Sequence, residues 1–409
     1  IPPECFQYSI PSQLRKGFYT YSREYMCYTM RMGNETPSIV IPSEWKTLIA
    51  RLPWVLLIPV GMLIKAFASR HPEMVERIYS GGLYPFLHRV FSSVFGILPF
   101  SFAEILFVLL ALTVPALLLY TLIKALLKRL PWSKFAGLVL TIIIAAGAIY
   151  NAFYLLWGLN YSRPKLSILL ELDVKQREAD ELEQICFSLA QKAVQIRKLV
   201  PEDENGVFKF PEKASAYFEQ IPKAYENLRA FIPVFSFRAS KPKPALASIG
   251  LSWAGISGIY SPFTAEPNVN VHQPALLILA AAAHESAHSL GIAREDEANF
   301  IAYLACMASN DPAFMYSGIM LALVHAGNEL HDERPDAFKR LYRSAYSEDM
   351  RRDIEHYNAY WSAYKGPVEE TITKVNDEYL KYNHQESGVK SYGEMVDLLL
   401  AWADRNDFA

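Results

Sequence analysis

The chain has few cysteines and no excess of charge of either sign. Four cysteines and nine histidines occur in 409 residues, and 40 basic residues stand against 42 acidic ones. So few cysteines exclude a disulfide framework. Cys186 and Cys306, the two beyond residue 160, form at most one disulfide or remain buried thiols. Balanced charge offers no surface of the kind that nucleic acids bind, so we expect no nucleic-acid partner.

Long hydrophobic runs, in contrast, are abundant. Hydrophobic residues make up 52% of the chain, and the excess lies in the first 160 residues. Residues 105–123 and 135–162 carry no charged side chain, and each run is long enough to cross the hydrocarbon core of a bilayer. Both runs therefore predict transmembrane helices.

A third run, residues 52–64, is shorter and is interrupted by Pro53 and Pro59. Arg51 and Lys65 flank it and can reach the membrane surface with their long side chains, so the run can still span. The alternative is an interfacial or re-entrant segment. We expect a disordered tail at residues 1–45 and a three-helix transmembrane region at 46–160, with helices at about 50–68, 103–123 and 135–159.

Basic residues in the loops predict the orientation. The eleven residues between the second and third helices contain Lys124, Lys128, Arg129 and Lys134. The much longer segment before the second helix carries only Arg70, Arg77 and Arg89. Because short basic loops stay in the cytoplasm, residues 161–409 are expected to form an extracytoplasmic domain.

The most informative motif is the sequence HESAH at residues 284–288, which follows an alanine-rich stretch. On a helix His284 and His288 leave the same face one turn apart, where both imidazoles can bind one zinc ion. Glu285 then lies beside the metal and not on it. A general base that accepts a proton from metal-activated water is needed at that position.

A third ligand is expected shortly downstream. Gly291 can end the helix and reverse the chain, and residues 295–299 (EDEAN) place carboxylates at the head of the next helix. This string is similar to the E-x-x-A-N pattern of gluzincin-type zinc peptidases. The resemblance implies that Glu295 is the third ligand and that Asn299 hydrogen-bonds a ligand histidine. Glu297 points to another face and is expected to be a structural or ion-pairing residue.

The motif also resembles that of metzincins, but their third histidine would fall at position 294, where this chain has Arg294. A guanidinium cannot ligate zinc. Arg294 is expected to pair with Asp296 or Glu297, or alternatively to contact a carbonyl or carboxylate of the substrate.

The remainder of the C-terminal half is expected to form a mostly helical α+β domain. Residues 71–100 are rich in aromatic residues and suit amphipathic segments on the outer leaflet or against this domain, or ordinary interhelical packing. The expected helices are 174–199, 212–230, one from Asp311-Pro312, one broken at Gly366-Pro367, and 392–402. The expected strands are 234–237, 246–253, 256–260 and 268–271.

Two features near the site keep alternatives open. In zincins a strand before the zinc helix forms the upper wall of the cleft, and residues 256–271 match that place by resemblance; a plain hairpin packed on the helix is the alternative. The donor to a transition-state oxyanion is not singled out by sequence, and the candidates are His325, His331, His356, His384, Tyr316 and Tyr392.

Two further strings extend the resemblance. Residues 157–163 (WGLNYSR) and 294–300 (REDEANF), with the three hydrophobic runs, look like the bacterial membrane-protein family called domain of unknown function 3810. The resemblance covers about residue 45 to the end. It implies a multi-pass protein of the bacterial cell membrane with an extracytoplasmic, zincin-like domain.

The function expected from these patterns is a membrane-anchored zinc metallopeptidase. Zn²⁺ would be held by His284, His288 and Glu295, with Glu285 as the catalytic base, and the partners would be an extracytoplasmic peptide or protein substrate and the lipid bilayer. One alternative is a non-catalytic zinc-binding sensor or scaffold. A transport or assembly protein with a vestigial site is another, but it needs more polar residues in the spans than Thr113, Thr141 and Asn151.

Overall fold

The computed structural model describes residues 42–175, 179–383, 385 and 394–406. The expected tail at residues 1–45 therefore falls almost wholly outside the described residues. The N-terminal elements are α1 Ser43–Arg51, η2 Leu52–Leu56, α2 Leu57–Ser69, α3 Pro72–Met74, η3 Val75–Leu83, α4 Tyr84–Phe95, α5 Phe102–Leu126, α6 Trp132–Leu156 and η4 Gly158–Ser162.

The remaining elements form the C-terminal domain, by which we mean the described part of residues 161–409. They are α7 Leu166–Leu169, α8 Ala179–Arg197, α9 Ala214–Tyr217, η5 Phe218–Gln220, α10 Ile221–Arg229, β1 Lys243–Pro244, α11 Ser248–Trp253, β2 Gly258–Ser261, β3 Glu266–Val269, α12 Ala275–Ser289, α13 Glu295–Ala308, α14 Pro312–Glu333, α15 Pro335–Ser344, α16 Glu348–Tyr364, α17 Pro367–Tyr382 and α18 Met395–Asn406.

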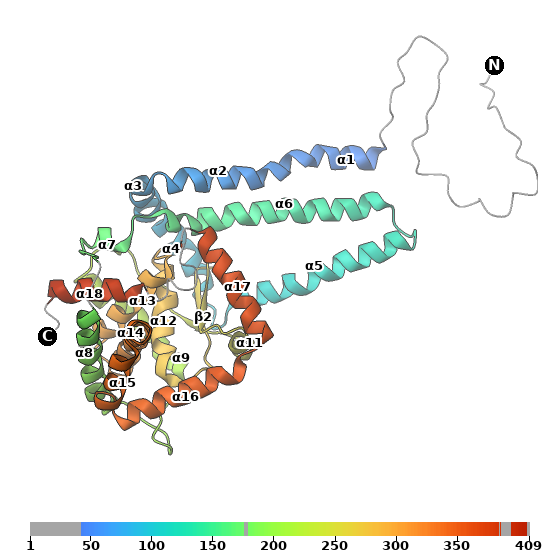
Figure 1. Cartoon of the computed structure of the whole chain (residues 1–409). Coiled ribbons are helices and arrows are strands. Elements are labelled where there is room, and N and C mark those ends of the chain that lie inside the picture. Colours follow the sequence, from blue (N-terminus) through green and yellow to red (C-terminus); the bar gives the residue numbers. More distant parts are fainter. Residues whose placement is uncertain (1–41, 176–178, 384, 386–393, 407–409) are drawn as a thin grey trace, which may run out of the picture. The chain divides into compact units, whose positions relative to one another are not determined.

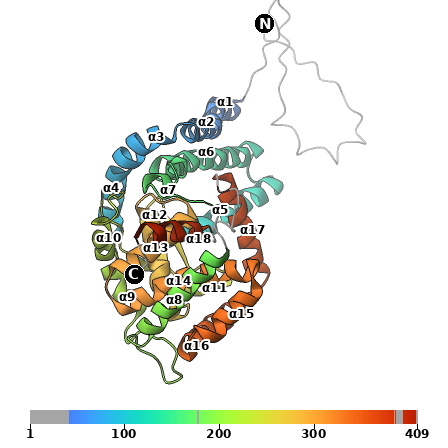
Figure 2. The ribbon, with the colours of Figure 1, turned by 60° about the vertical axis from the view of Figure 1, so that its left-hand side comes forward.

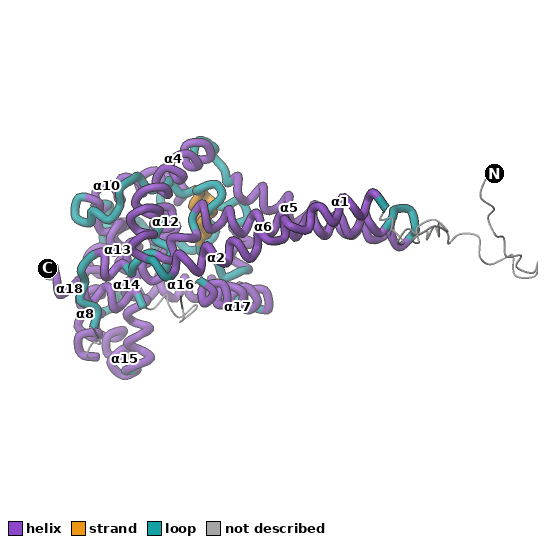
Figure 3. Tube along the Cα trace, turned by 90° about the horizontal axis from the view of Figure 1, so that it is seen from above, coloured by secondary structure: helices purple, strands orange, loops and turns teal. Residues whose placement is uncertain are grey.

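Helices dominate the described chain, as Figure 3 shows. The strands form one small sheet in the order β1-β3-β2, in which β1 is parallel and β2 antiparallel to β3. The expectation of a mostly helical protein with few strands is confirmed.

Three helical segments are long and apolar enough to cross a membrane: Ser43–Ser69, Phe102–Leu126 and Trp132–Leu156. They coincide with the three expected spans. The first run, where Pro53 lies in a 3₁₀ stretch, is part of a 27-residue helical segment and is not an isolated short helix. These segments support association with a membrane.

The chain divides into two compact units. One consists of Ile1–Leu56 and Leu118–Ala145, and within it Arg51 donates to the hydroxyl of Thr141. The other consists of Leu57–Leu117 and Ala146–Ala409. In this larger unit α2 and α6 pack closely, because Gly61 leaves room for the Tyr150 ring and Asn151 donates to the Leu57 carbonyl over 2.7 Å.

Helix α12 lies at the centre of the C-terminal domain. It contacts α13, α14, β2 and β3, and most of its side chains are buried. The long C-terminal helices follow one another round the edge of the domain, and α16 leads into α17 (Figures 1 and 2). The helix that carries the HESAH motif is thus fixed from several sides.

The segment at residues 71–100 packs one face on the C-terminal domain. Tyr84 is 1% exposed and donates to the Ser289 carbonyl over 2.8 Å, and His88 Nε2 lies 2.9 Å from the Ser240 hydroxyl. Two glycines, Gly81 and Gly82, lie in the π-helical stretch η3. Of the positions expected for this segment, contact with the C-terminal domain is the one observed for its buried face.

Two expected strands are wrong. Residues 246–253 contain helix α11, in which Ser248 and Ser252 are buried four residues apart while Ile249 and Trp253 are exposed at the same spacing. That is helical periodicity, which the short apolar run obscured. Residues 234–237 form an irregular stretch and not a strand. Phe235 is buried in the core, and Pro233 just before the stretch has no amide hydrogen for a strand ladder.

Two expected helices are shorter or broken. Residues 212–230 form α9, η5 and α10 in succession, since Pro222 cannot donate to the preceding turn. Within residues 174–199 the helix is Ala179–Arg197. The other strands are confirmed with shifted ends, as β2 and β3.

Helix ends with strong local signals agree with expectation. Asp311 caps α14 by accepting from the Ala313 amide over 2.8 Å, with Pro312 as first helical residue, and Gly366-Pro367 separates α16 from α17. The last expected helix is α18, whose N-terminal boundary adjoins residues outside the described ones. Cys186 and Cys306 are both buried free thiols, so they do not pair.

A buried ion pair joins α8 to α16. Arg197 Nε lies 2.6 Å from Asp353 Oδ2, and the two side chains are 2% and 0% exposed. Asp353 also accepts from the Tyr316 hydroxyl and the Phe208 amide, each over 2.7 Å. The carboxylate therefore satisfies donors from three parts of the chain.

Removing this carboxylate leaves the Arg197 charge buried without its partner. We expect Asp353→Ala to lower the free energy of unfolding by about 3–5 kcal/mol. The control is Glu202→Ala, because Glu202 is the 51% exposed second partner of Arg197 and its loss should cost less than about 1 kcal/mol. Thermal unfolding of the detergent-solubilised chain measures both, and equal losses of stability would contradict the assignment.

Candidate metal centre

Helix α12 presents two imidazoles from one face. His284 and His288 are four residues apart, and their ring centroids are 4.7 Å apart with the ring planes nearly perpendicular. The preceding alanines at 280, 282 and 283 are fully buried and allow neighbouring elements to approach the helix closely. Both histidines are consequently buried, at 9% and 6% exposed.

The chain reverses directly after α12. Gly291 has a φ of +80°, a conformation that favours glycine, and a Cβ at this position would lie 3.0 Å from the Asn160 side-chain oxygen. Helix α13 then begins at Glu295. The turn returns the chain to the histidine face, as the sequence predicted.

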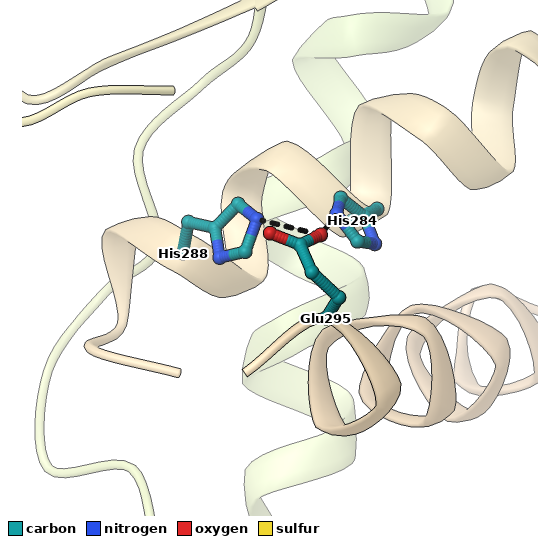
Figure 4. Close-up of side chains that lie close together, drawn as sticks. All are labelled: His284, His288 and Glu295. Carbon is teal, nitrogen blue, oxygen red and sulfur yellow. Dashed lines mark hydrogen bonds and ion pairs between the residues drawn. The ribbon is translucent and has the colours of Figure 1, made fainter. Parts of the chain in front are cut away.

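The turn brings Glu295 between the two histidines (Figure 4). Glu295 Oε2 lies 3.1 Å from His284 Nε2 and 3.7 Å from His288 Nε2. Three ligand atoms held tetrahedrally around zinc would be separated by about 3.3 Å, so these distances fit a single ion. The three side chains form the one group of three or more possible metal ligands that gather within 4.8 Å in the described part of the chain.

The Nδ1 atom of each imidazole, on the side of the ring away from Glu295, has a hydrogen-bond partner. His288 Nδ1 lies 2.7 Å from the Ile292 carbonyl, which can only accept, and His284 Nδ1 lies 2.7 Å from Asn299 Oδ1. Nδ1 of His288 must therefore carry the proton in the neutral ring, so the Nε2 lone pair is available on the Glu295 side. Asn299 makes the contact that the resemblance implied, and this arrangement fits a metal site.

The electrostatics of the three residues are strongly coupled. Burial alone would lower the pKa of His288, but the charge and hydrogen bond of Glu295, together with the Glu285 charge, raise it to about 9. Burial likewise acts to raise the pKa of Glu295, yet the two histidines hold it well below its usual value. A proton on His288 thus balances Glu295, and a bound cation would take over that role.

Glu285 lies on the same helix outside this group. Its side chain is 5% exposed, and burial raises the pKa of its carboxyl above the usual value. The Tyr260 amide donates to it, and Gly258 lies so close that a Cβ there would be 2.6 Å from Glu285 Cγ. Strand β2 therefore fixes the position of this carboxylate.

Arg294 and Glu297 belong to the surrounding structure. Arg294 Nη1 lies 3.2 Å from Glu297 Oε1, so the expected salt bridge is observed. The same oxygen accepts from the Leu166 amide over 2.7 Å. Glu297 thereby connects α13 to α7 and is directed away from the histidines, as its place in the sequence predicted.

Among the candidate oxyanion donors that the structure describes, His325 lies beside Asn299, which contacts the ligand candidate His284. Its Nε2 lies 3.5 Å from Asn299 Nδ2, and burial followed by the His284 charge lowers its pKa to about 4. Tyr316 is committed to Asp353, His331 is exposed beside Asp332, and His356 is exposed. His384 and Tyr392 lie outside the described residues.

Sequence reasoning missed Tyr379 of α17. Its hydroxyl lies 3.1 Å from that of Tyr161, which donates to it, and burial followed by the Glu295 charge raises the pKa of Tyr379 well above its usual value. Trp157 was noticed only as part of a resemblance, yet its ring lies 5.8 Å from that of His288. The sequence gives no signal that residues so distant along the chain meet at Glu295 and His288.

The fold and site define a helical, membrane-associated protein with a buried His-His-Glu cluster. The family model described as "Protein of unknown function (DUF3810)" matches residues 79–400. The chain belongs to this family, in agreement with the resemblance of its two motif strings. No curated protein and no solved structure matches it.

The two acidic residues at the start of α13 offer a matched test of metal binding. We expect Glu295→Gln to lose most of the zinc that the purified chain can hold, because an amide is a much poorer ligand than a carboxylate. Glu297→Gln should keep it, since its amide oxygen can still accept from the Leu166 amide. The number of zinc ions per chain, measured by mass spectrometry, shows which of the two carboxylates is a ligand. A Glu295→Gln protein with unchanged zinc would remove Glu295 from the ligand set.

Proposed function

We propose that this protein is a membrane-anchored zinc metallopeptidase that hydrolyses peptide bonds of an extracytoplasmic protein or peptide. The observation that carries the proposal is the buried carboxylate of Glu285, which lies beside the cluster of His284, His288 and Glu295 without being part of it. A cluster that served only to hold metal would not need a buried acid at this place.

In this proposal His284, His288 and Glu295 would hold Zn²⁺, which would supply the Lewis acid for water and for the scissile carbonyl. Glu285 would accept the proton of the attacking water and deliver it to the leaving amine. Its raised pKa suits this role, because a carboxylate in its buried surroundings binds a proton more readily than one in water.

A donor to the oxyanion completes the proposed set of residues. Tyr379 accepts from the Tyr161 hydroxyl, and its own hydroxyl carries a proton at neutral pH, as an ordinary tyrosine does, so it can donate a hydrogen bond. It lies within electrostatic reach of Glu295. We assign to Tyr379 the hydrogen bond that stabilises negative charge on the carbonyl oxygen.

The alternative function is a zinc-binding membrane sensor or scaffold. Structural zinc sites usually have four protein ligands, often cysteines. In the described part of the chain the cluster has three, and Cys306 is a buried thiol on α13 near the Leu279 carbonyl. Three ligands leave a position open for water and substrate, which favours catalysis.

Glu285→Gln separates these functions. The variant keeps an acceptor for the Tyr260 amide but loses the basic carboxylate, so we expect zinc content and thermal stability near wild type and turnover reduced by about 10²–10⁴. His284→Ala is the comparison, because it should lose zinc as well. New peptide ends in the membrane and surface fractions of cells report turnover. A Glu285→Gln strain that equals wild type wherever His284→Ala fails would establish the scaffold function.

The proposed location outside the cytoplasm rests on the basic residues where α5 leads into α6. Lys124 lies in the last turn of α5, Lys128 and Arg129 lie in the loop, and Lys134 lies in the first turn of α6. We expect a reporter that works only outside the cytoplasm to be active when it is fused after Arg163 and silent when it is fused at Arg129. The opposite pattern would place the metal centre in the cytoplasm and exclude an extracytoplasmic substrate.

A further inference from the structure

Helix α12, which carries His284 and His288, is attached directly to the residue that follows the third span, α6. Trp157 is the first residue after α6, and its indole Nε1 donates to the His288 carbonyl over 2.8 Å. The 25 residues of α6 extend about 37 Å, somewhat more than the hydrocarbon core of about 30 Å, so Trp157 falls in the headgroup layer. His288 therefore lies one side chain away from that layer.

Helix α17, which carries Tyr379, also contacts the membrane-spanning helices. The Tyr382 hydroxyl at the end of α17 lies 2.8 Å from that of Tyr150, and Lys65 of α2 donates to the Tyr382 carbonyl. Tyr150 precedes the end of α6 by six residues, which is about 9 Å along the helix. Helix α17 thus ends beside the outer part of the third span, and Tyr379 lies about one turn before that end.

Two residues beside the buried cluster reach the surface. The candidate ligands and Glu285 are buried, whereas Ile259 on β2 is 49% exposed and the side chain of Tyr379 on α17 is 37% exposed, although its hydroxyl is enclosed. β2 is an edge strand of the described sheet, since the order is β1-β3-β2. An edge strand can pair with an extended chain, so the approach that we infer for a substrate lies along β2 on the side of α17.

Exposed apolar side chains lie on α17 and near α11. This set, which we call the apolar rim, consists of Leu246, Ile249, Trp253, Val368 and Val375. Glu104 at the start of α5 accepts from the Leu246 and Ala247 amides, which holds one end of the rim at the second span. Figure 1 shows α17 beside the end of α6 from which the chain leaves the span. The elements that carry the rim are thus attached to the second and third spans, and exposed apolar side chains next to spans suit contact with lipid.

We propose that the substrate is a polypeptide anchored in the same membrane, which this protein cuts in the segment that emerges from the outer leaflet. The proposal rests on the proposed peptidase function and names its substrate class. An extended chain rises about 3.3 Å per residue, so a few residues beyond the bilayer suffice to reach a centre that is one Trp side chain away from the headgroup layer. A segment that leaves the bilayer is extended at this level, whereas a folded soluble protein has no extended segment there.

The first test does not depend on activity. The chain, with Cys5 and Cys27 replaced by serine, is reconstituted in phospholipid vesicles with a fluorophore on Val375→Cys or Ile259→Cys, and a nitroxide on the lipid headgroups quenches it. Leu199→Cys is the control, because Leu199 is 67% exposed and follows α8, which lies on the opposite side of the C-terminal domain from α17 in Figure 1. We expect strong quenching at Val375 and Ile259 and little at Leu199.

The second test compares anchored and free probes. A degenerate dodecapeptide library carries a hexadecyl chain at its N-terminus, at its C-terminus or at neither end, and is added to vesicles that hold the wild-type chain or Glu285→Gln. We expect wild type to cut the anchored library at least about tenfold faster, at bonds within about ten residues of the anchor. Glu285→Gln should cut neither library.

The other possible results contradict either the substrate proposal alone or the peptidase function together with it. If wild type cuts free and anchored libraries equally, or if Val375 and Ile259 are quenched no more than Leu199, the membrane-anchored substrate is wrong while the peptidase function stands. If wild type and Glu285→Gln cannot be distinguished on any library, the peptidase function fails and the substrate proposal fails with it.

Discussion

The structure depends most on how the C-terminal end of α12 is held. A helix leaves its last carbonyls without intrahelical partners, and here side chains from segments next to the spans supply the donors. Trp157 donates to the His288 carbonyl, Tyr84 to that of Ser289 and Arg163 to that of Gly291. The helix that carries both histidines is therefore fixed to membrane-proximal elements at the turn that returns the chain to Glu295.

These bonds explain why the polar residues of this region are buried. Arg163 is 7% exposed and also makes a two-pronged pair with Glu76 of η3, over 2.6 and 2.8 Å. An Arg–carboxylate fork fixes orientation as well as distance. Because η3 follows α2 closely and Arg163 follows α6, the first and third spans are tied to the same turn.

The second span, α5, is held by a carboxylate at its N-terminus. Glu266 on β3 accepts from the Phe102 and Ala103 amides at the start of α5, and it is paired with the buried Lys243 over 2.6 Å. A carboxylate at a helix N-terminus is favoured by the unpaired amides and the helix dipole. The small sheet is thereby attached to α5, and β2 of the same sheet positions Glu285 through Gly258. The helix with the candidate ligands is thus held by residues next to the first and third spans, whereas Glu285, the proposed base, is positioned by the sheet that is attached to the second span.

The sequence by itself determined what depends on local spacing. The uncharged runs required helices of membrane length, the four-residue spacing of His284 and His288 placed them on one face, and Gly291 ended their helix. Asp311-Pro312 and Gly366-Pro367 fixed helix boundaries for equally local reasons. Alternation over short apolar stretches was less decisive, so residues 246–253 were expected as a strand although they form α11.

Only the tertiary structure decided which distant residues meet the cluster. Tyr379 follows Glu295 by 84 positions, and its helix shows in sequence only an ordinary amphipathic pattern. Trp157 reads as the aromatic end of a span, and nothing in its neighbourhood along the chain points to His288. Such contacts depend on how whole helices pack, which is set by the summed burial of many side chains and not by any local preference. The residue pattern therefore identified the candidate ligands, and packing alone brought Trp157 and Tyr379 to them.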